Sequence, residues 1–289
     1  MPKCYICAMK RITAILTAIL SASVLFAQPG PPGVPDSYVF AGQTVSFSRP
    51  DMYERMDREL ITFTYMHSTS TLMIKRSGKI FPIVEPILKE YGIPDDIKYI
   101  MVIESNLDPT SVSRAGAAGL WQFMQATARE KGLEVNANVD ERYNTEKSTR
   151  AACKYLKEAY AKYGDWLTVA ASYNAGQGGI SAGLKNQRQK KATDLWLREE
   201  TSRYMFRVMA AKMLFENPES FGFSVSERYG DRRPKEVVTV TDEIPDLVQF
   251  ALDHGVSYAD LKRANLWLRE TKLNNASHRS YEIIIPDMR

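Results

Sequence analysis

Glu104 is an acidic residue at a position where the sequence calls for an apolar one. Ile97, Ile100 and Met101 mark the core-facing side of a predicted helix, and Glu104 is the next residue on that side. A carboxylate there is expected to be half buried, and desolvation raises the pKa of a carboxyl group because it disfavours the charged form. Such a group can hold a proton near neutral pH and serve as a general acid. Position alone nevertheless favours a structural, ion-paired carboxylate.

Glycines and a proline punctuate the segment that begins at Glu104, ESNLDPTSVSRAGAAGLWQFM. Pro109 is expected to end the helix. Gly116 and Gly119 are expected to bracket a turn into another helix, and glycine lets backbone approach a ligand closely. Ordinary turn glycines have the same signature, so this segment alone does not identify a site.

Two later segments carry polar side chains near helix ends. The run ASYNAGQGG (171–179) places Tyr173 and Asn174 at the end of a helix, ahead of a Gly-rich turn. Glu200 and Tyr204 lie four residues apart, which puts them on one face of a helix. A helix C-cap, a core aromatic residue and a solvated charge would account for these residues taken singly.

Metal chemistry has little support in the sequence. The histidines are His67, His254 and His278, none of which lies in a ligand spacing such as HExxH, and Cys153 has no neighbouring partner. The GQGG run at 176–179 follows a predicted helix instead of a strand, so it lacks the context of a phosphate-binding loop. We therefore expect neither a metal nor a cofactor.

The elements that must position these residues are predicted to be mainly helical. Pro94 suits the first turn of the helix that carries Glu104, whereas Pro82 and Pro86 are expected to limit how far the preceding helix runs. Further helices are expected at about 119–131, 145–163, 165–176 and 200–216.

A change of composition near Tyr229 indicates a second, smaller unit. The basic run GDRRPKE is followed by a β-like run at 237–240, helical patterns at 245–254 and 257–264, and the apolar run YEIIIP at 281–286. This order fits a β-α-α-β module. The alternative is that these residues complete the main domain.

The N-terminus has the features of a secretory signal peptide. Basic residues precede an apolar run from Ile12 to Ala27, which is shorter than the roughly 20 residues of a membrane-spanning helix. We expect cleavage after Ala27, with an uncleaved anchor as the alternative, and then an exposed Pro/Gly-rich linker over 28–50. An exported protein of the periplasm or cell envelope follows, with no membrane association after cleavage.

Cleavage would change the charge and the cysteine count. It would remove three basic residues and no acidic ones, so the formal net charge would fall from +4 to +1. We therefore expect no nucleic-acid partner. Cys4 and Cys7 would leave with the leader and Cys153 alone would remain, which excludes an intrachain disulfide.

Taken together, the motifs resemble the soluble-transglycosylase (SLT) type of lytic transglycosylase, bacterial enzymes that cleave peptidoglycan on a goose-lysozyme-like fold. The resemblance covers about residues 79–217 in the order ES, S..GA.GLWQFM, YNAG and ET...Y. Four ordered motifs are far more specific than one short pattern. The run DLWLREETSRYMFRVMAAKML is most similar to the membrane-bound transglycosylase D branch, although this chain has no cysteine at the cleavage junction.

The resemblance implies a role for each matching residue. Glu104 matches the family's single catalytic acid/base. The substrate-binding set that it implies is Ser113 near the N-acetyl group, Gly116 and Gly119 at the wall near the scissile bond, Gln122 of the GL.Q motif, Tyr173 and Asn174 along the cleft, Glu200, and Tyr204 facing the catalytic carboxylate. The implied partner is the glycan strand of peptidoglycan.

The implied reaction uses one carboxylate, where typical glycosidases use two. Glu104 would protonate the glycosidic oxygen between N-acetylmuramic acid and N-acetylglucosamine and then deprotonate the muramyl C6 hydroxyl, leaving a 1,6-anhydromuramyl end. Asp108 is the nearest second carboxylate, but it precedes Pro109 and is expected to cap or leave the helix. A hydrolytic muramidase and a catalytically silent peptidoglycan-binding scaffold are the alternatives.

The C-terminal module weakly resembles LysM, a glycan-binding β-α-α-β repeat, through HGVSYADLKRANLWL and its closing strand. TDEIPDL replaces the usual GDTL-like entry, so the module is expected to be degenerate. Two uses of the module remain as alternatives, glycan binding and packing against the catalytic domain.

The predicted fold class is mainly α, a lysozyme-like SLT domain with a small α+β module. The predicted units are the signal peptide (1–27), the linker (28–50), an N-terminal helical extension (51–78), the SLT domain (79–222) and the LysM-like module (230–289).

Overall fold

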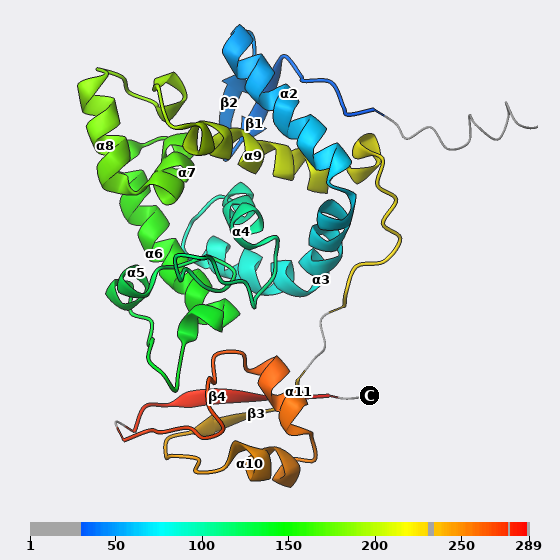
Figure 1. Ribbon diagram of the computed structural model, residues 1–289, viewed down its shortest axis with the longest axis vertical. Coiled ribbons are helices and arrows are strands. Elements are labelled where there is room, and N and C mark those ends of the chain that lie inside the picture. The colour runs from blue at the N-terminus through cyan, green and yellow to red at the C-terminus, as the bar shows by residue number, and fades with distance from the viewer. Residues whose placement is uncertain (1–29, 231–233, 277, 288–289) are drawn as a thin grey trace, which may run out of the picture.

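The computed structural model describes residues 30–230, 234–276 and 278–287, and its secondary structure is mainly helical (Figure 1). The predicted signal peptide, residues 1–27, lies outside the described residues. A large helical unit is followed by a small unit with a two-stranded sheet, which lies at one end of the large unit. The predicted fold class, mainly α with a small α+β module at the C-terminal end, is confirmed.

The prediction of an exposed linker over residues 28–50 is wrong for its second half, which forms a β-hairpin. Strands β1 (Ser37–Phe40) and β2 (Gln43–Ser46) pair antiparallel, and Phe40 and Phe47 are buried in the main core. Buried and exposed residues alternate along β2, a period-two strand pattern that the neighbouring proline and glycine residues conceal.

Two long helices come next, α2 (Pro50–Tyr65) and α3 (His67–Glu90). Helix α3 runs through both Pro82 and Pro86, so the prediction that these prolines limit the helix is wrong. A proline inside a helix loses one backbone hydrogen bond. Packing offsets this loss, because the apolar residues around the two prolines, Phe81, Val84, Ile87 and Leu88, are buried.

Helix α9 (Glu199–Glu216) packs against α2, α4 and α7. Most of its residues are buried, as in a helix that is covered on all sides. The other elements of this unit are η1 (Asp95–Ile97), α4 (Lys98–Ser105), α5 (Gln125–Glu130), η2 (Glu141–Tyr143), α6 (Thr145–Tyr163), α7 (Trp166–Ala175), α8 (Gln177–Asn186), η3 (Ala192–Asp194) and η4 (Pro218–Phe221).

Two local predictions fail at glycine-containing segments. The helix predicted over 119–131 is present only from Gln125, because the preceding residues form turns in which Gly119 and Gln122 have φ of 75° and 48°. The GQGG run, predicted as a flexible turn, instead begins α8. Gly176, with φ of 79°, makes the break from α7, and the residues after it are helical.

The small unit has the predicted β-α-α-β order. Strand β3 (Pro234–Val240) pairs antiparallel with β4 (Tyr281–Pro286), and α10 (Leu247–Asp253) and α11 (Tyr258–Ala264) lie between them in sequence. Alternate residues of β4 are buried, and they build a second core with apolar residues of both helices. This core is separate from the one around α9.

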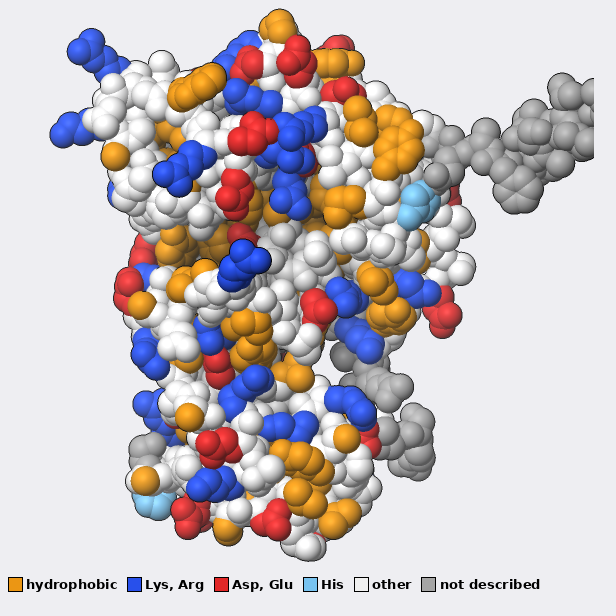
Figure 2. Space-filling model, in the orientation of Figure 1, with side chains coloured by type: hydrophobic (Ala, Val, Ile, Leu, Met, Phe, Trp, Pro, Cys, Tyr) orange, Lys and Arg blue, Asp and Glu red, His pale blue; other side chains and the backbone are white. Residues whose placement is uncertain are grey.

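The surface carries both signs of charge. On the face displayed in Figure 2, Lys and Arg side chains are interspersed with Asp and Glu over both units. Among the described residues, no helix combines the length and the apolar character needed to cross a membrane.

Candidate active site

Glu104 lies in the last turn of α4, which is buried along almost its whole length. The helix ends because Asn106 and Leu107 both adopt left-handed φ, of 51° and 55°, and the chain turns away directly after the acid. Its side chain is half-buried, as the sequence predicts. Burial raises the pKa of Glu104 to about 7, although a hydrogen bond and a nearby arginine both act to lower it.

Tyr204 is the hydrogen-bond partner of Glu104. Its hydroxyl donates to Oε1 of Glu104 over 2.6 Å, and its side chain is only 3% exposed. The contact joins residues 100 positions apart and depends on the packing of α4 against α9. Arg207, one turn further along α9, acts electrostatically to lower the pKa of Glu104, and Glu200 acts to raise it.

Tyr173 approaches the same carboxylate from α7. Its hydroxyl donates to the carbonyl oxygen of Trp121 over 2.7 Å, and its ring packs edge-on against Tyr155. Burial raises the pKa of Tyr173, and the charge of Glu104 adds to the rise. The two predicted tyrosines and the predicted acid therefore come together from α4, α7 and α9.

The predicted pair of Asn174 and Glu200 lies beside them. Asn174 Nδ2 donates to Oε1 of Glu200 over 3.4 Å, and its Oδ1 accepts a hydrogen bond of 2.8 Å from the hydroxyl of Thr201. Glu200 is exposed and Asn174 is partly exposed, so both polar groups are open to a ligand. The alternative explanation of Asn174 as a helix C-cap does not apply, because Gly176 is the C-cap of α7 and the Asn174 side chain bonds to α9.

The turns between α4 and α5 hold the remaining predicted residues. Ser113 is exposed, and its Oγ accepts a hydrogen bond of 3.0 Å from the amide of Ala117. Gly116 has φ of 86°, and a Cβ there would meet open space. At Gly119 a Cβ would lie 2.0 Å from the carbonyl oxygen of Arg142, so that only glycine allows this approach of two backbones.

Gln122 faces its own loop. Its Nε2 donates to the carbonyl oxygens of Ser111 and Gly119 over 3.0 and 2.8 Å. These bonds hold the loop in shape and support the left-handed backbone of Gln122 itself.

Asp108 is engaged elsewhere. It forms an ion pair of 3.0 Å with Arg76 and accepts two hydrogen bonds from Thr110. Burial acts to raise the pKa of Asp108, but the bonds from Thr110 and the charge of Arg76 together bring it below its usual value. A carboxylate held charged in this way is unsuited to act as an acid near neutral pH.

Several residues around the site are not singled out by the sequence analysis. Arg207 could have been predicted from its spacing, since it lies one helical turn from Tyr204 and therefore on the same face of α9. Arg142 has none that we can identify, because its contacts depend on the tertiary fold. The described part of the chain contains no group of three or more His, Cys, Asp or Glu residues that could hold a metal ion.

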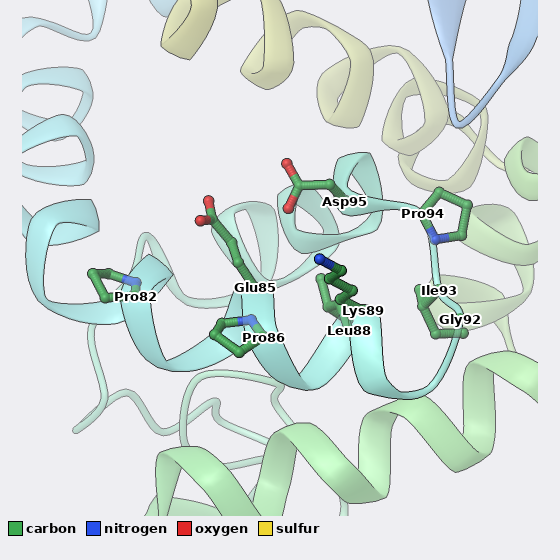
Figure 3. Close-up of a pocket in the computed structure, with 9 residues that line it drawn as sticks. All are labelled: Pro82, Glu85, Pro86, Leu88, Lys89, Gly92, Ile93, Pro94 and Asp95. Carbon is green, nitrogen blue, oxygen red and sulfur yellow. The ribbon is translucent and has the colours of Figure 1, made fainter.

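A cavity of about 750 Å³ lies away from this cluster, between the second half of α3 and the segment that leads into α4 (Figure 3). None of the predicted site residues lines it. Its lining is Pro82, Glu85, Pro86, Leu88, Lys89, Gly92, Ile93, Pro94 and Asp95.

Comparison with protein families identifies both units. Residues 82–196 match the transglycosylase SLT domain, and residues 236–289 match the C-terminal LysM-like domain of soluble lytic transglycosylases. Residues 82–196 thus carry a transglycosylase SLT domain. The predicted resemblance to the SLT type and the predicted LysM-like module are thereby confirmed.

Sequence identity to individual relatives is 29% or less in the following cases. Membrane-bound lytic murein transglycosylase D of Escherichia coli K12 is 29% identical over 232 residues, which are 78% of this chain and 48% of that protein. The chain thus spans about half the length of that relative. Two solved structures also align, the lytic transglycosylase Slt of Pseudomonas aeruginosa (24% identity, 52% of this chain and 26% of that one, TM-score 0.41) and the 70 kDa soluble lytic transglycosylase of Escherichia coli (19% identity, 60% and 33%, TM-score 0.43).

Proposed function

We propose that this chain is a lytic transglycosylase, which cleaves the β-1,4 bond between N-acetylmuramic acid and N-acetylglucosamine without water. The observation that carries the proposal is the state of Glu104. Its carboxyl group has a pKa raised to about 7 by burial and accepts a 2.6 Å hydrogen bond from Tyr204. A group with a pKa near the working pH can both give and take a proton.

The reaction needs Glu104 twice. The protonated carboxyl donates to the glycosidic oxygen, the bond from this oxygen to C1 of the muramyl residue breaks, and N-acetylglucosamine leaves with the proton. As the glycosidic bond breaks, the substrate's N-acetyl oxygen bonds to C1. This bond breaks again when the C6 oxygen attacks C1 in the next step. The carboxylate then takes the proton of the C6 hydroxyl, whose oxygen bonds to C1, so that a 1,6-anhydro ring forms and Glu104 regains its proton.

This sequence of steps requires no second protein carboxylate, which agrees with the engagement of Asp108 by Arg76 and Thr110. It also uses a nucleophile tethered within the sugar, and a tethered group has a large effective concentration relative to water. Tyr204 would orient the carboxyl group and stabilise its charged form between the two proton transfers.

The bound partner in this proposal is a peptidoglycan glycan strand. Ser113, Asn174 and Glu200 offer it exposed or partly exposed polar groups, and Tyr173 offers a partly exposed ring. Gly116, Gly119 and Gln122 would shape the wall near the scissile bond. We further propose that the chain acts in the periplasm or cell envelope after loss of residues 1–27, and that 79–222 and 230–289 bound the catalytic domain and the LysM-like module.

Mass spectrometry of muropeptides released from purified sacculi tests the proposal. The protein should release muropeptides that end in 1,6-anhydromuramic acid, each lighter by one water than the hydrolysed product. Glu104→Gln, which keeps the shape of the side chain but cannot exchange a proton, should lower the release by at least about a thousandfold. Glu54→Gln on the exposed side of α2 is the matched control and should be fully active.

Other results of the same experiment would support the alternative functions. Products that carry the added water would identify a hydrolytic muramidase. Retention on sacculi without any release would identify a silent binding scaffold. Full activity of the Glu104→Gln protein would contradict the mechanism, whichever product forms.

A further inference from the structure

The segment between α5 and η2 lies in both cores of the molecule. Val139, from the large unit, is 1% exposed and is part of the hydrophobic core of the C-terminal module. Its backbone forms a bridge with Leu268, and the amide of the next residue, Asp140, donates to the carbonyl oxygen of Trp267 over 2.9 Å. The module therefore completes its core with a residue from more than 90 positions earlier in the chain.

Asn138 fastens the same segment with polar contacts. Its Nδ2 donates to the carbonyl oxygen of Lys272 over 2.7 Å, and its Oδ1 accepts from the amide of Asn274 over 2.9 Å. Its own carbonyl oxygen accepts from the amide of Arg269 over 2.8 Å. These bonds are shielded from water, because Asn138 is buried, and buried polar groups that lose their partners are costly. The docking is thus specific and not a loose surface contact.

Arg142, three residues after Val139, carries the connection to the candidate active site. Its guanidinium is 5% exposed and pairs with Asp140 through two contacts of 3.0 and 2.8 Å. Its remaining terminal nitrogen, Nη1, donates to the carbonyl oxygens of Gly116 and Phe123 over 2.7 and 3.0 Å. One buried cation thus joins the two ends of the loop that holds the predicted wall residues.

The backbone of Arg142 supports the same loop. Its carbonyl oxygen occupies the space that a side chain at Gly119 would fill. The loop therefore rests on Arg142 through both its guanidinium and its main chain. A shift of the segment from Val139 to Arg142 must move the turns at Gly116 and Gly119, because close-packed interiors transmit displacement.

We propose that Val139 and Arg142 are positioning residues through which the C-terminal module holds the wall of the catalytic cleft. The inference rests on the proposed function for its catalytic consequence, but the mechanical link stands on the contacts alone. The module then serves catalysis by packing, and its removal loosens the loop that contains Ser113, Gly116, Gly119 and Gln122. A misplacement of about 1 Å in such a wall costs on the order of a hundredfold in rate.

Two matched substitutions in the full-length protein test the link. Val139→Asp places a charge in the core of the module, whereas Val248→Asp places the same charge on the exposed side of α10. Hydrogen exchange measured by mass spectrometry should accelerate at least about tenfold in the peptide covering 111–123 of Val139→Asp and stay unchanged in Val248→Asp. The kcat on solubilised glycan strands should fall about 10- to 100-fold, with KM changed less than about twofold.

Arg142→Met tests the link between the module and the loop if the Val139→Asp protein does not fold. It should accelerate exchange over 111–123 and lower kcat while the exchange of β3 and β4 is unchanged, because only the link to the loop is removed. Arg142→Lys keeps the charge beside Asp140 and should recover part of the rate. A protein in which the module is loosened but the loop exchange and kcat are unchanged would overturn the inference.

Failure of the proposed function gives a different result. In that case the unmutated protein would release no anhydromuropeptides, yet exchange over 111–123 would still respond to Val139→Asp if the link is present. Unchanged exchange in an active enzyme would defeat the inference and leave the proposed function standing.

Discussion

Glu104 and Glu59 each interrupt the apolar face of a helix. The two acids differ in the groups that their carboxylates contact. Glu104 on α4 is half-buried and meets a neutral hydroxyl, that of Tyr204. Glu59 on α2 is fully buried and meets cations, with Arg203 at 2.5 Å and Arg207 at 3.7 Å. The contacts of Glu59 are those of a buried structural ion pair, whereas the side chain of Glu104 is partly exposed. Of these two acids, only Glu104 is therefore open to contact with a substrate.

The raised pKa of Glu104 predicts a pH-dependent cost to stability. Between the ordinary value of 4.5 and the folded value of about 7, the folded protein binds more protons than the unfolded chain, so stability falls as pH rises through this window. Glu104→Gln removes this dependence. We expect the variant to gain about 1–3 kcal/mol over the unmutated protein at about pH 8 and almost nothing at about pH 3.5, below the ordinary pKa, as measured by urea midpoints. A gain of equal size at both values would contradict the assignment.

Removal of the Tyr204 hydroxyl should move the alkaline limb of the pH–rate profile. Glu104 must be protonated to act as the acid, so activity falls as pH rises through its pKa. Tyr204→Phe removes a hydrogen bond that favours the charged carboxylate and should raise this pKa by about one unit. We also expect kcat to fall about tenfold, because the carboxyl group loses its orienting contact. Tyr53→Phe, at an exposed position on α2, is the control and should change neither quantity.

At the level of elements, the N-terminal hairpin and α9 both contact η1, the short helix that leads into α4. The amide of Ala41 donates to Oδ2 of Asp96 over 2.7 Å, and Lys212 on α9 donates to the same oxygen over 2.8 Å. Lys212 also reaches the carbonyl oxygen of Val39 over 2.7 Å. The hairpin thereby braces the two helices that bring Glu104 and Tyr204 together.

Phe40 should be the residue through which the hairpin stabilises the protein. It is fully buried in the main core, whereas Val39 beside it is largely exposed. We expect Phe40→Ala to lower the free energy of unfolding by about 3–5 kcal/mol and Val39→Ala to change it by no more than about 0.5 kcal/mol. Denaturant titration followed by circular dichroism measures both. Equal effects would mean that the hairpin is not part of the core.

Sequence patterns predict those elements whose signals are local. The helix predicted over 145–163 has the observed limits of α6, because Asn144 caps its start and Gly164 ends it. The start of α8 and the hairpin are missed because glycine and proline there indicate a loop, whereas tertiary packing decides the structure. Phe40 and Phe47 give no sustained period by themselves.

The candidate site shows the same division. Ordered motifs locate Glu104, Tyr204 and Tyr173, which the structure brings together from three helices. The supporting contacts of Arg142 and Glu59 could not be read from the sequence, because a buried charge is informative only once its partners are known. The catalytic role of Glu104 and the roles of all the substrate-binding residues stay predictions.

At the scale of the whole molecule, the charges are mixed and largely paired. A cavity of about 440 Å³ between the two units is lined by five basic residues, Lys131, Lys147, Arg150, Lys154 and Arg279, but four of them form ion pairs with glutamates. Figure 2 shows a similar mixture on the displayed face. The protein therefore lacks a strong charge bias over the surface that this view displays.

Binding to sacculi should consequently depend only weakly on salt. Long-range attraction is screened within about 10 Å at 0.1 M salt, and it is large only where charges of one sign accumulate. We expect retention of the Glu104→Gln protein, which leaves the substrate intact, to change less than roughly twofold between about 50 and 300 mM salt. A steep fall would instead assign binding to the basic cavity, and Lys154→Glu would then reduce it.

The insertion of Val139 into the second core also has a consequence for protein engineering. Residues 234–287 cannot be exchanged alone for the module of a relative. The transplanted module would not find, on the large unit, the segment that completes its core. A working chimera must carry residues 134–142 together with the module. Recombination with the gene of a relative is then expected to succeed at breakpoints that take both of these distant segments from the same parent.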